Sequence, residues 1–216
     1  MKQKEIFMQA EGDAWFARNR HGLETRKLPE DDYLLCALLE VCGSGLGLKV
    51  LEIGCGDGAR LAWLKNHLKA DCYGVEPSAQ AVAVANSKGI NVQQGTADSL
   101  PFTEREFDIV LFGFCLYLCD REDLFRIASE ADRVLRAPGW IMILDFYSSK
   151  PYEKIYHHLP GVKSYKMDCR NLFTWHPNYE CLAHKVMHHS QSVFTDDQDE
   201  WVAVSTLRKT QKSLIV

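Results

Sequence analysis

Leu-Glu-Ile-Gly-Cys-Gly-Asp-Gly, residues 51–58, is the stretch that decides the fold of this 216-residue chain. An apolar strand is predicted at 48–53, and glycine then occupies every second position up to residue 58. Glycine lets a backbone turn tightly and approach a ligand closely, because it has no Cβ. Leu61, Leu64 and Leu68 follow at helical spacing. A strand, a glycine loop and a helix in this order typically bind a nucleotide-like cofactor at the carboxyl end of a parallel sheet.

The same stretch also fits a different kind of cofactor. Gly54, Gly56 and Ala59 satisfy the dinucleotide fingerprint G-x-G-x-x-G/A. Glu76, twenty residues after Gly56, would fit the ribose-binding acid of that motif. An NAD(P)-dependent oxidoreductase therefore stays open as an alternative.

Three acids at successive strand ends favour S-adenosylmethionine over a dinucleotide. Glu52 lies on the first strand, Glu76 ends the next apolar run, and Asp98 follows a third strand predicted at 90–94. Carboxylates suit a ribose diol, an adenine amine and a cationic group, because the first two donate hydrogen bonds and the third is positively charged. A pyrophosphate would instead be repelled by Glu52 and by Asp57.

With these motifs the chain resembles the class I S-adenosylmethionine-dependent methyltransferases that act on small molecules. The matching text covers about residues 45–146 in order and spacing. It consists of Val-Leu-Glu-Ile-Gly-Cys-Gly-Asp-Gly (50–58), Gly-Val-Glu-Pro-Ser (74–78), Gly-Thr-Ala-Asp-Ser-Leu-Pro-Phe (95–102), Phe-Asp-Ile-Val-Leu (107–111) and Val-Leu-Arg-Ala-Pro-Gly-Trp (134–140). Ala137-Pro138-Gly139 departs from the family, which more often has a basic residue followed by Pro-Gly-Gly.

The resemblance implies a set of cofactor contacts. The loop Gly54–Gly58, with Gly56 at its centre, would lie against the methionine part. Glu76 would bind the ribose hydroxyls and Asp98 the adenine amine. The remaining implied cofactor residues are Glu52, Pro77, Ala97 and Phe114, together with Arg18, which could pair with the methionine carboxylate from a leading helix.

Methyl transfer requires alignment more than activation, because the sulfonium is already activated. Tyr117 follows the fourth strand, where the family often places a residue over the reacting methyl group. A hydroxyl or amine acceptor must also lose a proton, and a histidine near its ordinary pKa suits that task. His157 and His158 are candidates by position alone.

Strands alternating with helices predict a three-layer, Rossmann-like α/β sandwich. Its mostly parallel sheet would have seven strands and a C-terminal antiparallel hairpin. Helices are expected at 13–20, 29–41, 78–85 and 120–137, and Gly43–Gly47 would end the second of them. Strands are expected at 48–53, 73–75, 90–94, 107–112 and 140–146, followed by a hairpin of 186–194 with 201–207. The single domain would comprise a helical cap (1–46), a cofactor core (47–146), a substrate lid (147–185) and the terminal hairpin (186–216).

The predicted lid is rich in aromatic and histidine side chains, as a small-ligand pocket needs. Its aromatic residues are Tyr147, Tyr152, Tyr156, Tyr165, Phe173, Trp175 and Tyr179. His184 and His188 would share a face if the segment were helical, but no third metal ligand is indicated, so we expect no metal.

Composition narrows the class of protein further. A net charge of −4 argues against a nucleic-acid partner. The chain opens without a signal-like apolar run and has no membrane-spanning stretch. Eight cysteines without C-x-x-C spacing predict reduced core thiols in the cytoplasm. We expect a small-molecule substrate, with a homodimer and a non-catalytic cofactor-binding accessory protein kept open.

Overall fold

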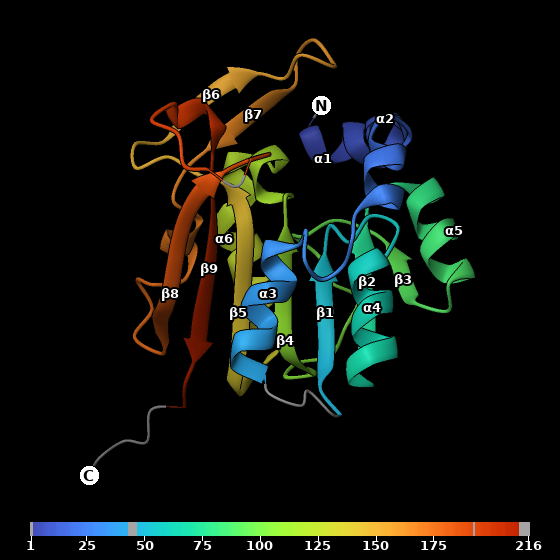
Figure 1. Ribbon diagram of the computed structural model, residues 1–216, viewed down its shortest axis with the longest axis vertical. Coiled ribbons are helices and arrows are strands. Elements are labelled where there is room, and N and C mark those ends of the chain that lie inside the picture. Colours follow the sequence, from blue (N-terminus) through green and yellow to red (C-terminus); the bar gives the residue numbers. More distant parts are fainter. Residues whose placement is uncertain (1, 43–46, 192, 212–216) are drawn as a thin grey trace.

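The computed structural model describes residues 2–42, 47–191 and 193–211 (Figure 1). A seven-stranded sheet has the order β3-β2-β1-β4-β5-β9-β8. Strands β1 to β5 are mutually parallel, whereas β9 is antiparallel to both β5 and β8. The bounds are β1 Lys49–Ile53, β2 Asp71–Glu76, β3 Asn91–Gln94, β4 Phe107–Gly113, β5 Leu135–Phe146, β8 Tyr179–His188 and β9 Trp201–Lys209. The predicted fold class is confirmed.

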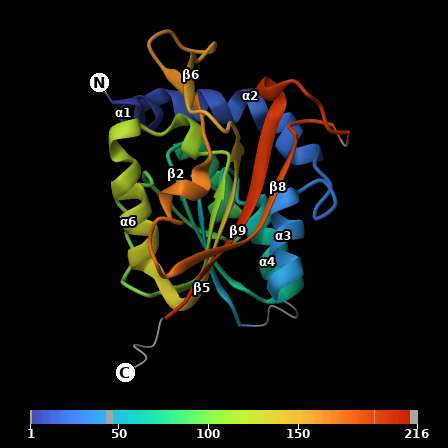
Figure 2. The ribbon, with the colours of Figure 1, turned by 90° about the vertical axis from the view of Figure 1, so that its left-hand side faces the viewer.

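Helices cover both faces of the sheet (Figure 2). Alternate residues of β4 enter opposite cores: Val110 and Phe112 join the cluster that contains α6, whereas Ile109 and Leu111 join the one that contains α3 and α4. These strands are buried on both faces, which explains their continuous apolar sequence. The helices are α1 Gln3–Ile6, α2 Gly12–Thr25, α3 Tyr33–Cys42, α4 Ala59–Leu68, α5 Ala79–Ser87 and α6 Leu124–Val134, with a π-helical segment at Phe7–Glu11.

Several predicted helix boundaries are wrong. The helix predicted at 13–20 spans Gly12–Thr25, and the one predicted from 120 begins at Leu124, after a 3-10 turn at Arg121–Asp123. The second helix begins at Tyr33 rather than at Pro29, after Asp32 accepts a hydrogen bond of 2.9 Å from the Leu35 amide. Helix α6 ends at Val134, and β5 already pairs through Leu135 with Phe107. Pro138 therefore lies inside β5, at the irregularity between its first and second pairings with β4, where a proline is tolerated. The predicted helix end at 43–46 lies outside the described residues.

The C-terminal hairpin exists, but its first strand was misplaced. Strand β8 begins at Tyr179, so 179–185 belongs to the sheet and not to a lid. His184 and His188 consequently share a strand, not a helix. The strand was missed because it lies at the sheet edge, where few of its residues are buried and the apolar signal is weak.

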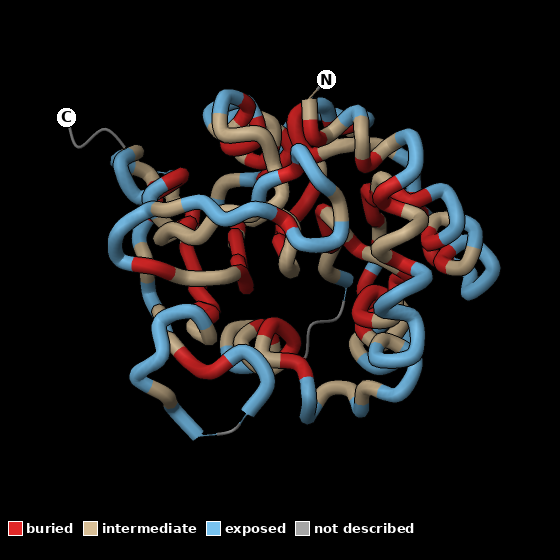
Figure 3. Tube along the Cα trace, turned by 90° about the horizontal axis from the view of Figure 1, so that it is seen from above, coloured by how far each residue is buried: buried red, intermediate tan, exposed pale blue. Residues whose placement is uncertain are grey.

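A second, smaller hairpin occupies the middle of the predicted lid. Strands β6 (Tyr152–Ile155) and β7 (Lys163–Lys166) pair antiparallel and rise above the carboxyl ends of the parallel strands (Figure 1). The Gln3 side chain donates to the Lys163 carbonyl over 3.1 Å and accepts from the Lys163 amide over 2.6 Å. These bonds tie the N-terminal helices to the hairpin. Viewed from above, buried segments lie in the interior, and exposed segments form most of the outer rim (Figure 3).

No helix among the described residues combines the length and apolar character that crossing a bilayer requires. Nor do three or more potential metal-ligating side chains converge anywhere in residues 2–42, 47–191 and 193–211. The eight cysteines carry free thiols.

A buried ion cluster lies under the glycine loop. The Arg60 guanidinium donates to both Asp32 oxygens at 3.1 Å and also bonds Glu52. The Asp32 side chain is fully buried and that of Glu52 is 1% exposed. Burial opposes ionisation of Asp32, but the nearby Arg60 outweighs it and lowers the pKa of Asp32.

Removal of Arg60 should therefore destabilise the fold strongly. In Arg60→Met the buried Glu52 loses its only ion-pair partner among the described residues and Asp32 retains only Arg26, and breaking a buried pair in this way costs about 3–5 kcal/mol of unfolding free energy. Urea unfolding followed by circular dichroism measures the change. Arg20→Met, which breaks an exposed pair with Glu24, is the control and should leave the midpoint unchanged. Equal midpoints for both variants would show that the cluster adds nothing to stability.

Candidate functional site

A cavity of about 440 Å³ opens at the carboxyl ends of the parallel strands. Parallel strands end at the same edge of a sheet, so residues distant in sequence meet there. The loops after β1, β2, β3 and β4 form one wall. The N-terminal helices, the β6–β7 hairpin and the residue after β8 form the remainder.

The glycine loop approaches the cavity with its backbone. Gly56 has a φ of +53°, and a Cβ there would meet no atom within 4 Å, so the loop leaves open space at this point. Gly54 has a φ of +74°, and its Cβ would clash with Cys115 at 2.6 Å. Gly58 does not line the cavity; it precedes α4, and a Cβ would press on Ala85 at 3.1 Å. The Gly58 position thus serves the turn and helix packing.

Glu76 anchors the glycine loop from the end of β2. Its carboxylate accepts the Gly56 amide and the Ser78 amide, each over 2.9 Å. Burial raises the pKa of Glu76 to about 7, although these two hydrogen bonds oppose the shift. Pro77 lines the cavity beside it. Each carboxylate oxygen retains a lone pair for a further donor.

Glu52 on β1 both pairs with a buried arginine of the fold and lines the cavity. Glu52 lines the cavity and bonds Arg60 through one oxygen, while its buried second oxygen has no partner in the described part of the chain. Arg26 also lines the cavity, pairs with Asp32 at 3.0 Å and leaves its buried Nε without an acceptor there. Sequence analysis missed Arg26, because it follows α2 in no recognisable motif.

Arg18, the predicted partner of a cofactor carboxylate, points elsewhere. Its guanidinium bonds Glu11 and donates to the Tyr156 hydroxyl over 3.0 Å. It does not line the cavity. The reason is the docking of α2, which turns Arg18 towards the β6–β7 segment and leaves the cavity to Trp15 and Asn19.

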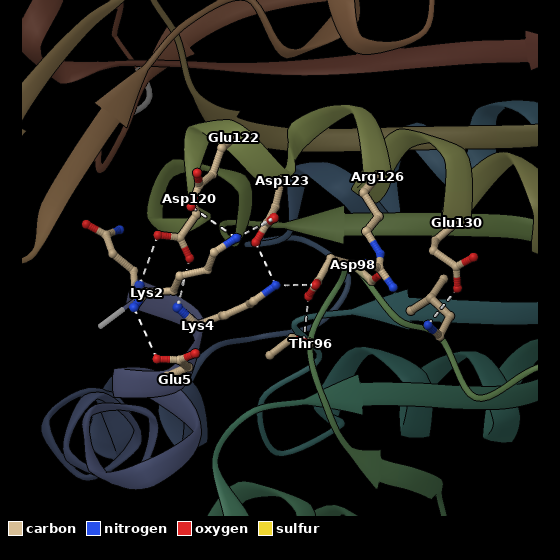
Figure 4. A network of polar contacts seen from close by, with 12 residues as sticks. Lys2, Lys4, Glu5, Thr96, Asp98, Asp120, Glu122, Asp123, Arg126 and Glu130 are labelled. Carbon is tan, nitrogen blue, oxygen red and sulfur yellow. Dashed lines mark hydrogen bonds and ion pairs between the residues drawn. The ribbon is translucent and has the colours of Figure 1, made fainter.

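Asp98, the acid that follows β3, is paired with a lysine of the N-terminal segment (Figure 4). Asp98 accepts the Thr96 hydroxyl over 2.7 Å and forms an ion pair with Lys4, whose ammonium also reaches Asp123 at 2.7 Å. Burial disfavours the Asp98 anion, but Lys4 and Thr96 outweigh it and lower the pKa of Asp98. Ala97 and Phe114 line the cavity nearby. A cationic side chain therefore lies where the resemblance implies an adenine amine.

Backbone bonds hold this N-terminal segment in place. Asp120 accepts the amides of Gln3 and Lys4 at 2.9 and 3.1 Å. Lys2 pairs with Glu122 at 3.0 Å and with Asp123 at 3.1 Å. The segment is docked by charge on the loop between β4 and α6 (Figure 4).

The far side of the cavity contains the residues predicted for chemistry. Tyr117 lines it, and its ring lies edge-on to Phe146 with centroids 4.9 Å apart. Burial raises the pKa of Tyr117, so the phenol stays protonated. His157 and His158 also line the cavity from exposed positions, with ring centroids 3.8 Å apart. The structure therefore brings all three together with the cofactor candidates.

Residues 51–143 match the family described as "Methyltransferase domain". A protein named "Uncharacterized methyltransferase YcgJ" from Bacillus subtilis is 32% identical over 108 residues, which cover 46% of this chain and 41% of that protein. Over residues 51–143 the chain is therefore similar to methyltransferase domains. The matches span less than half the length of the first three curated relatives.

Solved structures share the fold of this chain. One is the 1,6-didemethyltoxoflavin-N1-methyltransferase of Burkholderia thailandensis with bound 1,6-didemethyltoxoflavin and S-adenosylhomocysteine, at a TM-score of 0.65 and 17% identity, covering 92% of this chain and 87% of that one. Another is the [4+2]-cyclase SpnF, at 0.66 and 17%, covering 84% and 82%. At such identities the likeness concerns the fold alone.

Two further residues line the cavity without having been predicted as site residues from the sequence. Lys166 and His189 line the cavity from β7 and from just beyond β8. Burial lowers the pKa of each. No motif marks them, because they reach the cavity only through the tertiary arrangement of two hairpins.

Asp145 was also missed by the sequence analysis. Its carboxylate accepts the amides of Phe146, Leu116 and Tyr117 at 2.8, 2.8 and 3.3 Å and so fixes the turn that carries Tyr117.

Lys4 should compete with an adenine amine for Asp98. We expect Lys4→Met to bind S-adenosylhomocysteine about twofold to fivefold more tightly, since the amine no longer displaces an ammonium from a partly exposed ion pair. Calorimetric titration measures the dissociation constant. Lys2→Met, which loses pairs with Glu122 and Asp123 but none with Asp98, is the matched control. Weaker binding by Lys4→Met alone would mean that Lys4 closes over the bound ligand.

Proposed function

We propose that this chain is an enzyme that transfers the methyl group of S-adenosylmethionine to an oxygen or nitrogen atom of a small metabolite. The observation that carries the proposal is the set of carboxylates at the strand ends. Glu52, Glu76 and Asp98 line one cavity beside the glycine loop. Their spacing and chemistry suit the cationic end, the ribose diol and the adenine amine of this cofactor.

The unpartnered buried atoms support the fit at the methionine end. The free oxygen of Glu52 accepts hydrogen bonds and the Nε of Arg26 donates them, and both residues line the cavity. A buried polar atom without a partner costs free energy. An amino acid zwitterion would supply an ammonium to the first and a carboxylate to the second. We therefore assign Arg26, in place of Arg18, to the cofactor carboxylate.

The sulfonium supplies an activated methyl group, so the protein's own residues align the reactants and exclude water. Tyr117, held by the turn that Asp145 fixes, borders the reaction space next to Phe146. A neutral imidazole can take the proton that a hydroxyl or amine acceptor releases. His157 and His158 are candidates for that role, and slight desolvation together with the nearby Arg18 and His157 lowers the pKa of the exposed His158.

Three alternatives remain as outcomes of the test. An NAD(P)-dependent oxidoreductase would have to place a pyrophosphate near Glu52 and Asp57, two of the carboxylates that line the cavity. A cofactor-binding accessory protein, or an enzyme of another reaction class, would bind S-adenosylmethionine without methyl transfer. The cyclase among the structural neighbours carries the same fold, so fold alone does not select the reaction.

Cellular context is part of the proposal. Eight free thiols suit a reducing compartment such as the cytoplasm. The net charge of −4 does not favour a nucleic-acid acceptor. A homodimer is compatible with these features.

The decisive experiment compares cofactors and then follows the methyl group. S-adenosylhomocysteine should bind in the calorimeter and NAD should not. Methyl-labelled S-adenosylmethionine, incubated with the protein and a metabolite extract, should yield a labelled small molecule. Binding of NAD in preference to S-adenosylhomocysteine would reject the proposal, and cofactor binding without label transfer would favour the accessory protein.

The affinity should also depend on pH through Glu76. Hydrogen bonds from a diol favour the ionised carboxylate, whereas burial raises the pKa of the free carboxyl to about 7. Binding of S-adenosylhomocysteine must then release a proton at lower pH, and its affinity should rise about tenfold between pH 6 and pH 8. Titration in two buffers of different ionisation enthalpy counts the proton.

Glu76→Gln provides the matched variant. It should weaken binding of S-adenosylhomocysteine roughly tenfold at pH 8, since the hydroxyls lose a charged acceptor. It should also remove the Glu76 part of the pH dependence and leave only the part due to Glu52, whose pKa burial likewise raises to about 7. An unchanged pH profile in Glu76→Gln would show that another group titrates and that Glu76 does not bind the diol.

A further inference from the structure

Given the methyl transfer proposed above, on which this step rests, we propose that the methyl acceptor is a planar, conjugated molecule with an acidic oxygen. This oxygen, of a carboxylate or an acidic ring hydroxyl, would lie between Lys166 and His189 against the ring of Phe146. It is the atom that receives the methyl group.

The carboxylates that line the cavity are confined to one of its halves, where the cations Lys4, Arg26 and Arg60 also lie. Every carboxylate among the described lining residues comes from β1, from β2 or from the loops that follow β1, β3 and β4: Glu52, Asp57, Glu76, Asp98, Asp120 and Asp123. The β6–β7 segment and the end of β8 instead contribute His157, His158, Lys166 and His189, with no acid. The second half, whose described lining has no carboxylate, thus suits an anion.

The basic half has a flat aromatic centre. Phe146 at the end of β5 contacts Tyr117 and His189, with ring centroids 4.9 and 5.0 Å away. The Lys166 ammonium lies 5.0 Å from the centroid of the same ring. Three segments far apart in the sequence thus meet around the ring of Phe146. Stacked and edge-on aromatic contacts favour a planar ligand.

Lys166 keeps donor capacity for such a ligand. Its ammonium donates to the Asp199 carbonyl and forms no ion pair with any described residue. An ammonium has three donors, so further bonds remain to be made. The charged groups around it are Asp197, Asp199, Glu200 and Lys154, and Asp199 is already paired with Lys154 at 2.7 Å. Hydrogen bonds between an ammonium and an oxyanion are stronger than neutral ones.

His189 supplies the complementary proton acceptor. Its pKa is lowered mainly by burial, with Lys166 and His188 adding to the effect against Glu200. The neutral ring can accept a proton from an acceptor that arrives as its conjugate acid. The oxygen then forms its bond to the methyl carbon as the methyl–sulfur bond breaks, and the electron pair of that bond stays on sulfur. The products are S-adenosylhomocysteine and a neutral methyl ether or ester, which no longer pairs with Lys166.

The test uses ligands of equal shape and different charge. The protein, saturated with S-adenosylhomocysteine, is titrated with 2-naphthoate, 2-naphthamide and 2-naphthylmethylammonium. We expect the carboxylate to bind roughly tenfold more tightly than the amide, as a charge-assisted hydrogen bond provides, and the cation to bind least. Lys166→Gln should make the carboxylate and the amide equal. Lys163→Gln, on the same strand but paired with the exposed Glu153, should keep the full difference.

Equal affinity for all three ligands, a preference for the cation, or no binding of the carboxylate up to about 10 mM would overturn the proposal. So would a carboxylate preference that survives in Lys166→Gln while circular dichroism shows an intact fold. Repeating the titrations without S-adenosylhomocysteine distinguishes failure of this acceptor proposal from failure of the proposed methyl transfer. Selective carboxylate binding by a protein that does not bind S-adenosylhomocysteine would reject methyl transfer but keep an acidic ligand for the basic half.

Discussion

The site depends on the placement of Arg60 between two buried carboxylates. The guanidinium joins Asp32, which directly precedes α3, to Glu52, which lies in β1 beside the central strand β4. Gly113 at the end of β4 must remain without a side chain, because a Cβ there would lie 2.9 Å from the guanidinium. One cation thus fixes the distance between a helix, the central strand and its neighbour. The glycine loop starts from this fixed point and turns towards the cavity.

Several elements can be predicted from the local sequence alone, because their burial requires apolar residues. Strands β1 and β4 are buried on both faces, so their apolar runs identify them without any partner. Ser78 also begins α5 as predicted, with its hydroxyl accepting the Ala81 amide over 3.0 Å. Glu76 and Asp98 reach the cavity because the ends of parallel strands cannot avoid meeting.

The rest of the site depends on tertiary contacts that leave no local signal. Strand β8 lies at the sheet edge, and its largely unburied sequence resembles a loop. The choice between Arg18 and Arg26 depends on how α2 docks, and helical periodicity favours neither. Lys4 meets Asp98 across 94 positions of sequence, and nothing near either residue indicates the other. Side chains of this kind are identified only when the backbone is in place.

The ligand-free cavity satisfies its own acids with its own cations. Lys4 neutralises Asp98, and Arg60 neutralises part of Glu52. Glu76 alone is held by amides, and burial raises its pKa, as burial raises that of Glu52 in spite of the nearby Arg60. A cationic ligand with a diol would therefore change these three carboxylates in different ways. It would displace an ammonium at Asp98, add to an existing ion pair at Glu52 and ionise Glu76. The described lining of the basic half includes no acid, and Asp199 beside Lys166 is already paired with Lys154. An anionic group on the entering molecule would therefore be the partner that Lys166 lacks, so the proposed selection of the acceptor acts through its charge.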